Sequence, residues 1–456
     1  MSKTILAIDI GSTKICAIIA EMANDGVLSI TGAGISKAQG LRRGSITNIE
    51  QASRSIKAAL DDAKRISGSD AKRAVVSISG AYTKSVNSSG IVNIQNKEVN
   101  FKEIERVMQT ALYNANIPHE YEILHALPYN FKVDDQNYIE DPLGMNASRL
   151  EVDVHIITTQ KSSLNNLRKA INSTGIEIDS VVLSSYASSI AVLNDDEKEL
   201  GVAVIDMGGS TCNIAIHSGN SLRYNDFLAV GSNHITSDLS MALHTPIGSA
   251  DQVKLTYGSL LNSSNDLIEL PVIGDDNNKQ EVSLTVVRNV IYARVEETLM
   301  ILAQFIENSG LKDKLGAGVV LTGGFSQLEG LRDLAVATFG SLPVRLAKPR
   351  EMDGLFENLR SPEYSSAIGL LLYTINDYTN YEIDINKRVR HHSQQIAEPV
   401  EPINLAGDLA IPAVELGKDE QPQKMIELAK KKKKDEKDPN KQGGLSGFWN
   451  WATQLF

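Results

Sequence analysis

The segments ILAIDIGSTKICAII (residues 5–19) and VAVIDMGGSTCNIAI (residues 202–216) share one pattern, and this pattern decides the fold. Each segment reads as an apolar strand, an aspartate, a glycine turn, a Ser-Thr pair and a second apolar strand. The glycines permit a tight hairpin whose backbone N–H groups can face an anion. The repetition predicts an internally duplicated chain.

The repeated hairpins contain candidate phosphate and metal ligands. The residues expected to bind phosphate are Gly11, Ser12, Thr13 and Lys14 in the first copy and Gly208, Gly209, Ser210 and Thr211 in the second. Asp9 and Asp206 end their strands, where a carboxylate can hold Mg²⁺ through its water shell. For a single copy, a strand followed by a turn explains the pattern as well, and Lys14 would then face solvent. The second copy favours the phosphate interpretation.

Two further segments fit a nucleotide site. VVLTGGFSQLEGL (residues 319–331) is an apolar strand that runs into Gly323-Gly324 and then into a helix, which suits close approach of the backbone to a nucleoside. ADQVKLTYGSL (residues 250–260) reads as a helix. The chain has no GxxxxGK[ST] motif and no GxGxxG motif between a strand and a helix, so neither a P-loop nor a Rossmann site is predicted.

In this spacing, the segments resemble the actin-like ATPase superfamily. The resemblance implies an α/β fold of two ribonuclease-H-like βββαβα domains, with ATP and Mg²⁺ in the cleft between them. It also implies that Asp251 and Lys254 flank the ribose and adenine, and that Gly323, Gly324 and Phe325 form the adenosine loop. Asp251 is shorter than the glutamate usual at its position. Without the other motifs, Asp251 and Lys254 would read as an exposed i, i+3 pair.

The residues after the first hairpin resemble one particular family within this superfamily. SISGAYTKSVNSSGIVNI (residues 77–94) and the segment up to residue 158 are similar to the 1C subdomain inserted in the FtsA family of bacterial cell-division proteins. The matching residues are His125, Pro128, Asp134, Asp141, Pro142, Gly144, Met145, Arg149, Glu151 and His155. From their places in alternating strands, His125 and His155 are expected to be structural rather than metal ligands.

The resemblance implies a division of the chain into subdomains. The expected parts are 1A at 1–80 and 162–200, the SHS2-like 1C insertion at 81–161, 2A at 201–240 and 305–378, 2B at 241–304, a disordered linker at 379–443 and a membrane-targeting amphipathic helix at 444–456.

Composition limits the other function classes. The formal net charge is −11, which argues against nucleic acid as a partner. Two cysteines, Cys16 and Cys212, provide neither a disulfide framework nor a zinc site. We expect neither a signal peptide nor a spanning helix, because no apolar run approaches the roughly 20 residues that a bilayer requires.

Turnover is expected to be slow. Hydrolytic actin-like relatives carry Gln or Glu where this chain has SVVLSSYASSIAVL (residues 180–193), which offers only serines and Tyr186. A neutral serine orients an attacking water poorly. The sequence therefore predicts tight ATP binding with weak or absent ATPase activity.

The last part of the chain predicts a tether and an anchor. No aromatic residue occurs from residue 382 to 447, so this segment is expected to be disordered; whether 424–434 forms a helix stays open. Seven lysines and three acidic residues between 430 and 441 give this segment a net positive charge, which favours binding to anionic lipids.

In a terminal helix, one face would carry Leu445, Phe448, Trp449, Leu455 and Phe456, with Trp451 beside it. Twelve residues reach only about 18 Å, so the helix would lie in the membrane interface. The alternative is a helix that docks on the protein itself.

The FtsA resemblance implies an adaptor that polymerises, tethers the FtsZ ring to the inner face of the cytoplasmic membrane at the septum and helps to recruit later divisome proteins. The FtsZ C-terminal peptide would dock on 2B, where we expect Arg288, Arg294 and Glu297 to contact it. The alternatives are a PilM-like scaffold of a pilus machine and, with less support, a sugar or acetate kinase.

Overall fold

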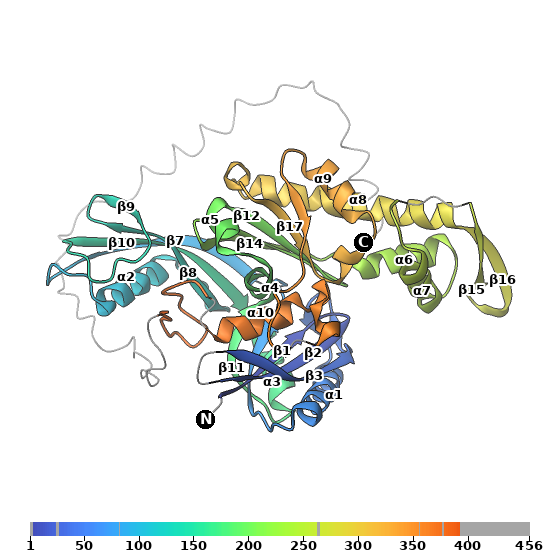
Figure 1. The fold of residues 1–456 in the computed structure, drawn as a ribbon, viewed down its shortest axis with the longest axis horizontal. Helices are drawn as coiled ribbons and strands as arrows, with labels where there is room; N and C mark the ends of the chain where they lie inside the picture. The colour runs from blue at the N-terminus through green and yellow to red at the C-terminus, as the bar shows by residue number, and fades with distance from the viewer. Residues whose placement is uncertain are drawn as a thin grey trace, which may run out of the picture. The chain divides into compact units, whose positions relative to one another are not determined.

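Two five-stranded sheets repeat one topology in the computed structural model, which describes residues 3–392 except 24–26, 82, 262–264, 355 and 376–377 (Figure 1). The first sheet has the order β11 (Glu177–Leu183), β6 (Arg73–Ile78), β1 (Lys3–Ile10), β2 (Lys14–Met22) and β3 (Leu28–Lys37). The second has the order β14 (Ser221–Leu228), β13 (Cys212–Ser218), β12 (Val202–Met207), β17 (Gly318–Thr322) and β18 (Val344–Leu346).

In each sheet, three consecutive antiparallel strands are followed by two parallel ones. β1, β2 and β3 pair antiparallel, and β6 and β11 then add in parallel. β12, β13 and β14 repeat the antiparallel set, with β17 and β18 in parallel. This confirms the predicted duplicated actin-like fold. We call the first sheet with its helices the first lobe, and the second sheet with its helices the second lobe.

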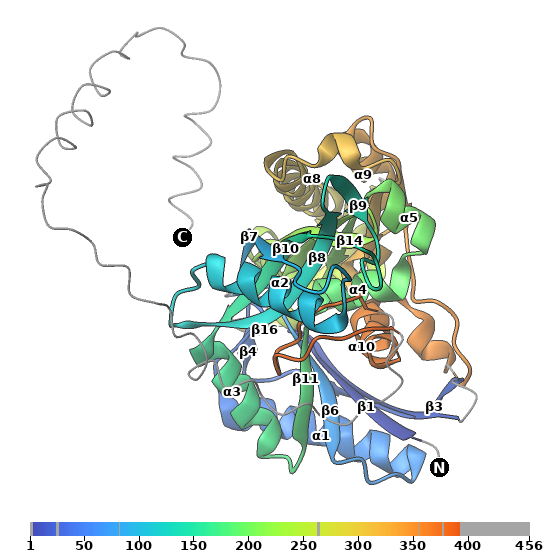
Figure 2. The same cartoon turned by 90° about the vertical axis from the view of Figure 1, so that its left-hand side faces the viewer.

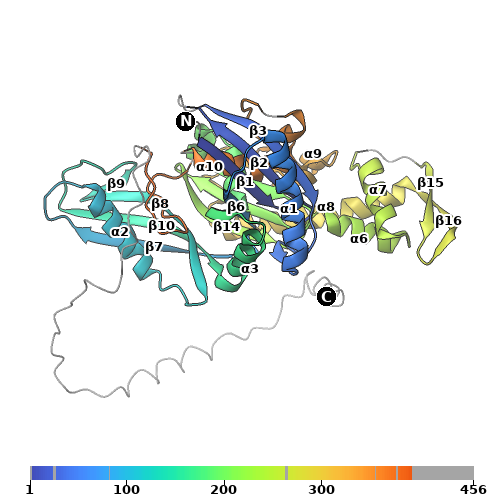
Figure 3. The same ribbon diagram turned by 90° about the horizontal axis from the view of Figure 1, so that it is seen from below.

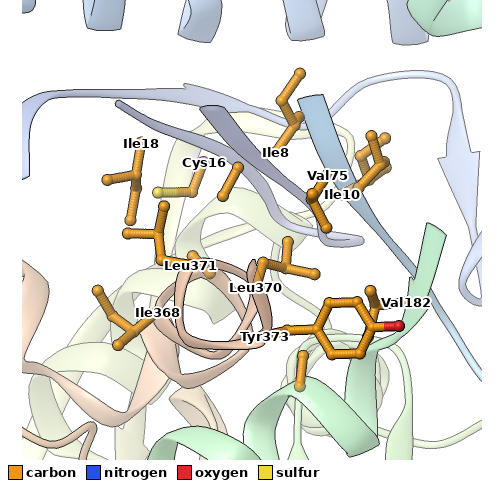
Figure 4. Close-up of a cluster of buried hydrophobic side chains, with 14 of the residues drawn as sticks. Ile8, Ile10, Cys16, Ile18, Val75, Val182, Ile368, Leu370, Leu371 and Tyr373 are labelled. Carbon is orange, nitrogen blue, oxygen red and sulfur yellow. The ribbon is translucent and has the colours of Figure 1, made fainter. Parts of the chain in front are cut away.

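The core of the first lobe lies between its sheet and two layers of helices. One face is covered by α1 (Ile49–Ser67) and α3 (Lys161–Asn172), as Figure 3 shows. The other face packs against α4 (Ser184–Val192) and α10 (Ser365–Thr374). In Figure 4, strand residues such as Ile18 and Val75 meet Leu370 and Leu371 of α10. Because these strands are covered on both faces, they read as continuous apolar runs.

Helix α1 illustrates how local sequence sets the elements. Asn48 precedes it and accepts a hydrogen bond from the Gln51 backbone N–H at 3.0 Å. Gly68 ends it in a left-handed conformation, with φ of 68°. Ala52, Ile56, Ala59, Leu60 and Ala63 are buried along one stripe. This amphipathic face holds the helix on the sheet.

A separate four-stranded sheet is inserted after β6, and we call it the insertion. Its order is β7 (Thr83–Asn93), β10 (Arg149–Gln160), β8 (Tyr121–Val133) and β9 (Gln136–Ile139). Helix α2 (Phe101–Asn114) covers one face (Figure 2). The other side reaches the second lobe, because the Ser221 hydroxyl donates to the Pro128 carbonyl at 2.8 Å.

The small subdomain of the second lobe extends from its sheet. It contains α6 (Ser232–Ala242), α7 (Ile247–Tyr257), β15 (Leu267–Val272), β16 (Asp275–Ser283) and α8 (Leu284–Asn308) (Figure 1). The expected boundaries of 2B, residues 241 and 304, fall inside α6 and α8. Both helices continue past them, and nothing in their sequences breaks there.

The remaining described elements are short. They are β4 (Leu41–Arg42), β5 (Ser45–Ile46), α5 (Asp195–Leu200), α9 (Leu331–Phe339) and the 3₁₀ turns η1 (Lys312–Lys314), η2 (Gly324–Gln327), η3 (Glu357–Arg360) and η4 (Pro362–Tyr364). No helix in the described part of the chain is long and apolar enough to cross a membrane.

One expectation needs correction. The sequence predicts a disordered linker from residue 379, but residues 379–392 are described and partly buried. Tyr381, Glu382 and Ile383 are fully or almost fully buried. Ile383 bridges Ala126 of β8 with backbone hydrogen bonds of 2.9 and 3.0 Å. The alternating apolar residues of YEIDI (residues 381–385) suit pairing with the edge of a strand. The prediction of disorder rested on the lack of aromatic residues after Tyr381 and did not take this alternation into account. The rest of the predicted linker and the terminal helix lie outside the described residues.

Candidate functional site

The two repeated hairpins face each other between the lobes. Their turns close alike: the Gly11 N–H donates to the Lys14 carbonyl at 3.1 Å, and the Gly208 N–H donates to the Thr211 carbonyl at 2.8 Å. A Cβ at Gly209 would lie 2.2 Å from the Thr13 side chain. Only glycine therefore permits this approach of the two turns.

The third glycine segment lies beside the second hairpin, because β17 pairs with β12. Gly323 has φ of 87°, and a Cβ there would lie 2.4 Å from Asp206 Oδ1. The chain can therefore pass close to the carboxylate only with glycine at this position.

These segments enclose a cavity of about 310 Å³. The predicted residues in its wall are Asp9, Gly11, Ser12, Thr13, Lys14, Asp206, Gly208, Gly209, Thr211, Asp251, Lys254, Gly323, Gly324 and Phe325. Ser210 is not in the wall, and its hydroxyl accepts a hydrogen bond from Asn233 Nδ2 at 3.1 Å. The wall residues that the sequence did not single out include Ser79, Ser184, Asn213, Ser232, Asn233, Leu255, Glu363 and Ser366.

Of the two strand-end aspartates in this wall, Asp9 is buried and Asp206 is partly buried. Burial raises the pKa of Asp9 to about 6; a hydrogen bond from Ser77 opposes the rise, and the charge of Asp206 adds to it. Burial also raises the pKa of Asp206. The hydroxyls of Ser188 and Ser366 donate to Asp206 Oδ2 at 2.6 and 3.0 Å. Two oxygen-donor groups at the cavity floor suit a hard cation such as Mg²⁺.

Lys14 is held by a carboxylate and an aromatic ring. Its Nζ lies 2.9 Å from Glu363 Oε2 and 3.3 Å from the centre of the Tyr364 ring. Burial lowers the pKa of Lys14, and the hydrogen bond to Glu363 opposes that effect. Lys14 is part of the cavity wall and its side chain is 18% exposed, but its Nζ is covered in this arrangement. A phosphate in the cavity would compete with Glu363 for the ammonium.

Asp251 and Lys254 form more than an exposed helix pair. Lys254 Nζ donates to Asp251 Oδ1 and to the Thr236 hydroxyl, both at 2.7 Å, and that hydroxyl donates to Asp251 at 2.9 Å. Burial raises the pKa of Asp251, but the hydrogen bonds from Lys254 and Thr236 outweigh it and lower the pKa. The group ties α7 to α6 at the edge of the cavity.

Helix α4 contributes hydroxyls to the cavity. Ser184 lies in the wall, and Ser188 donates to Asp206. Tyr186 is turned away, and its hydroxyl donates to Glu382 at 3.2 Å. Glu363 is the carboxylate of the wall that the sequence analysis missed. It comes from a segment far along the chain, and no motif there marks it.

The two histidines that the sequence singles out in the insertion have structural partners. His125 Nδ1 lies 2.6 Å from Glu382 Oε1, and both side chains are fully buried. The Leu183 N–H donates to His125 Nε2 at 3.1 Å. His155 contacts Asn87 and Asn225. No group of three potential metal ligands occurs among the described residues.

The expected partner-binding residues lie on α8. The Arg294 guanidinium forms two hydrogen bonds to Asp238 of α6, at 2.6 and 3.0 Å, and also contacts Glu297. Arg288 Nε donates to the Leu260 carbonyl at 3.1 Å. Arg294 therefore links α6 to α8, a role that the sequence did not reveal.

A duplicated fold with two glycine hairpins facing one cleft defines an actin-like ATPase fold. The PilM–PilN type IV pilus biogenesis complex is a solved structure with this architecture, with a TM-score of 0.60 at 17% identity over 82% of this chain and 98% of that one. At this identity, the likeness concerns the fold alone.

Sequence comparison narrows the class. The models "SHS2 domain inserted in FTSA" and "Cell division protein FtsA" match residues 80–158 and 203–369. Cell division protein FtsA from Helicobacter pylori J99 is 40% identical over 85% of both chains. The Pseudomonas aeruginosa PAO1 protein is 35% identical over 88% of this chain and 95% of its own length, and the Escherichia coli K12 protein 32% over 85% and 94%. This chain belongs to the FtsA family of cell division proteins.

Proposed function

We propose that this chain is an ATP-binding adaptor that polymerises and tethers the FtsZ ring to the inner face of the cytoplasmic membrane at the septum. The observation that carries the proposal is the pair of hairpin turns that meet at one cavity, so close that a Cβ added at Gly209 would lie 2.2 Å from the Thr13 side chain. A cavity with backbone donors from both lobes suits a polyphosphate that joins them.

The residues present fit ATP and Mg²⁺. The hairpin turns and Lys14 would hold the phosphates, Asp9 and Asp206 would hold the metal through its water shell, and Gly323, Gly324 and Phe325 would face the nucleoside. Bound Mg²⁺ would neutralise phosphate charge. Asp251 and Lys254 would flank the ribose and adenine. The serines of α4 position water poorly, so we expect weak turnover or none.

The membrane link would come from the terminal residues. Leu445, Phe448, Trp449, Trp451, Leu455 and Phe456 would enter the interface of an anionic bilayer. A short amphipathic helix is marginal alone, and assembly of many copies into an actin-like filament would convert weak contacts into avidity. Later divisome proteins are expected to join this filament.

Co-sedimentation with anionic liposomes tests the anchor. The full chain is compared with a chain that ends at Gln442, each with and without Mg·ATP. We expect only the full chain to pellet, and ATP to strengthen its binding. Equal pelleting of both chains would contradict an anchor in the last residues.

The FtsZ C-terminal peptide is proposed to dock on the small subdomain near Arg288, Arg294 and Glu297. The carboxylate of an acidic peptide end would displace Asp238 and Glu297 and bind the Arg294 guanidinium in their place. Arg294→Glu should weaken peptide binding, whereas Arg54→Glu on the exposed face of α1 should not. Unchanged affinity of the Arg294 variant would remove this residue from the site.

A further inference from the structure

The charges of the cavity wall are poorly matched to a polyphosphate. Its two lysines are each paired with a carboxylate of the same wall: Lys14 with Glu363 at 2.9 Å and Lys254 with Asp251 at 2.7 Å. Asp9 and Asp206 add two further carboxyl groups. A nucleoside triphosphate brings several negative charges, of which a metal ion neutralises only a part. The site therefore needs a positive charge that is not already paired.

The turn between β4 and β5 lies at this cavity. Leu41 pairs with Ile46 and Arg42 with Ser45, so the turn consists of Arg43 and Gly44. Gly44 is part of the cavity wall, and a Cβ there would lie 2.4 Å from the Ser79 hydroxyl. The turn is therefore pressed against Ser79 of the first lobe, which is also part of the cavity wall.

Arg43 is an unusual residue for its backbone conformation. Arg43 and Gly44 have φ of 49° and 78°. Positive φ at both central residues defines a type I′ hairpin turn, which favours Asn or Gly at the first position because other side chains are strained there. Local structure thus gives no reason for arginine. Residues held in strained conformations concentrate at functional sites.

The Arg43 side chain is exposed, and no described residue forms an ion pair with it. Its charge nevertheless reaches the second lobe. Burial and the charge of Arg294 lower the pKa of His234 on α6; the Gly231 backbone hydrogen bond and Asp238 oppose them, and Arg43 makes the smallest contribution to the lowering. Asn233, the residue before His234, donates its N–H to the Gly209 carbonyl of the second hairpin at 2.7 Å. Arg43 therefore stands on the first lobe next to the wall residue Gly44, and its charge is felt on α6 of the second lobe.

We propose that Arg43 supplies the unpaired positive charge that recognises the terminal phosphate of a nucleoside triphosphate, so that the cleft prefers the triphosphate to the diphosphate. This inference rests on the proposed function, in which the cleft binds nucleotide. A guanidinium suits the task because its planar fork donates two parallel hydrogen bonds to phosphate oxygens. Without a competing carboxylate, Arg43 can turn toward the phosphate at little cost. The strained turn fixes the start of the side chain at the cleft.

Arg43→Asn separates this role from folding, because asparagine is a preferred residue at this turn. The matched control is Arg42→Asn, which removes the same charge from the neighbouring exposed residue in β4. The affinities of the full chains for Mg·ATP and Mg·ADP are measured by titration calorimetry, with thermal unfolding alongside. For Arg43→Asn we expect about a tenfold loss of ATP affinity, less than about a twofold loss of ADP affinity, and a melting temperature that is unchanged or higher. Arg42→Asn should leave both affinities unchanged.

The outcomes distinguish the two claims. If the unmodified chain binds neither nucleotide, the proposed function fails, and the role of Arg43 fails with it. If the unmodified chain binds nucleotide but Arg43→Asn keeps its ratio of ATP to ADP affinity, the proposed function stands and the role of Arg43 is wrong. The same conclusion holds if Arg42→Asn lowers the ratio equally, because the effect would then be one of overall charge.

Discussion

The two hairpins at the cleft align position for position, and three of their sequence differences bear on the cleft. Asp9 pairs with Cys16 across the first hairpin, and Asp206 pairs with Asn213 across the second. In this alignment Gly11 corresponds to Gly208, but Ser12, Lys14 and Cys16 correspond to Gly209, Thr211 and Asn213. The backbone turn is the same in both copies, so the differences show what each lobe contributes.

The first hairpin provides the charge, and the second provides the contact between lobes. Lys14 is an ammonium at the cavity, whereas Thr211 offers a neutral hydroxyl. Asn213 is buried, and its Oδ1 accepts a hydrogen bond from the Gly80 N–H of the first lobe at 3.1 Å. Cys16 is a buried apolar side chain, and burial raises the pKa of its thiol to about 12. The duplicated hairpin has thus become asymmetric.

The largest expected effect comes from removing the charge on one side. Lys14→Ala should lower ATP affinity on the order of 100-fold, because it removes a charged hydrogen-bond donor to phosphate. Thr211→Ala at the equivalent position should cost only about fivefold, since its donor is neutral. Titration calorimetry measures both. Equal losses would mean that the hairpins contribute alike and would break the comparison.

The third strands of the two sheets, β3 and β14, also differ in what they contact, and this difference makes the free energy of unfolding depend on pH. β3 packs on α1, whereas β14 meets the insertion, where His155 lies 2.9 Å from Asn225. Burial lowers the pKa of His155 from 6.5 to about 4, and its hydrogen bond to Asn225 Oδ1 opposes this only in part. As the pH falls, His155 is therefore protonated in the unfolded chain before it is protonated in the folded chain. The contribution of neutral His155 to the free energy of unfolding is present above pH 6.5 and is lost as the pH decreases toward 4.

Between pH 6.5 and 5 we therefore expect His155 to contribute a loss of about 2 kcal/mol in the free energy of unfolding. His155→Gln should lose this part of the pH slope. The slope from His217, whose pKa burial lowers to about 3, should remain. Urea unfolding of both chains at the two pH values gives the difference. Parallel stability curves would show that His155 is not a buried neutral group.

Asn213→Cys gives the second hairpin the residue that the first hairpin has at the equivalent position, Cys16. It leaves the buried Gly80 N–H without its partner, so we expect a loss of about 1.5 kcal/mol in the free energy of unfolding. Denaturant titration measures the loss. Cys16→Ala, which breaks no hydrogen bond between lobes, should leave nucleotide affinity unchanged. A wild-type stability of Asn213→Cys would show that this bond does not hold the lobes.

The smallest expected effect concerns the carboxylate that holds Lys14. Glu363→Gln removes a competitor for the ammonium, so ATP affinity should rise about threefold. Glu357→Gln on η3 is the matched control, because its side chain is exposed and lies outside the cavity wall. If Glu363→Gln instead weakened binding, Glu363 would be a positioning group for the ligand rather than a competitor.

The sequence predicted those parts of the site whose signal is local. Each hairpin carries its glycines, hydroxyls and aspartate within a few residues, and the i, i+3 spacing of Asp251 and Lys254 places both on one helix face. Glu363 and Ser366 could not be found in this way, because they enter the wall only through the packing of η4 and α10. The strain at Arg43 is visible only in the backbone. The burial of residues 379–392 depends on the edge of β8, which lies far away in the sequence.

Hydrogen–deuterium exchange of the full chain with and without Mg·ATP tests the central claim most directly, namely that both hairpins build one nucleotide site. We predict that ATP slows exchange together at residues 11–14, 208–211 and 323–325, because their backbone amides enclose the same ligand. Protection at only one of the two hairpins, or at neither, would contradict a site shared between the lobes.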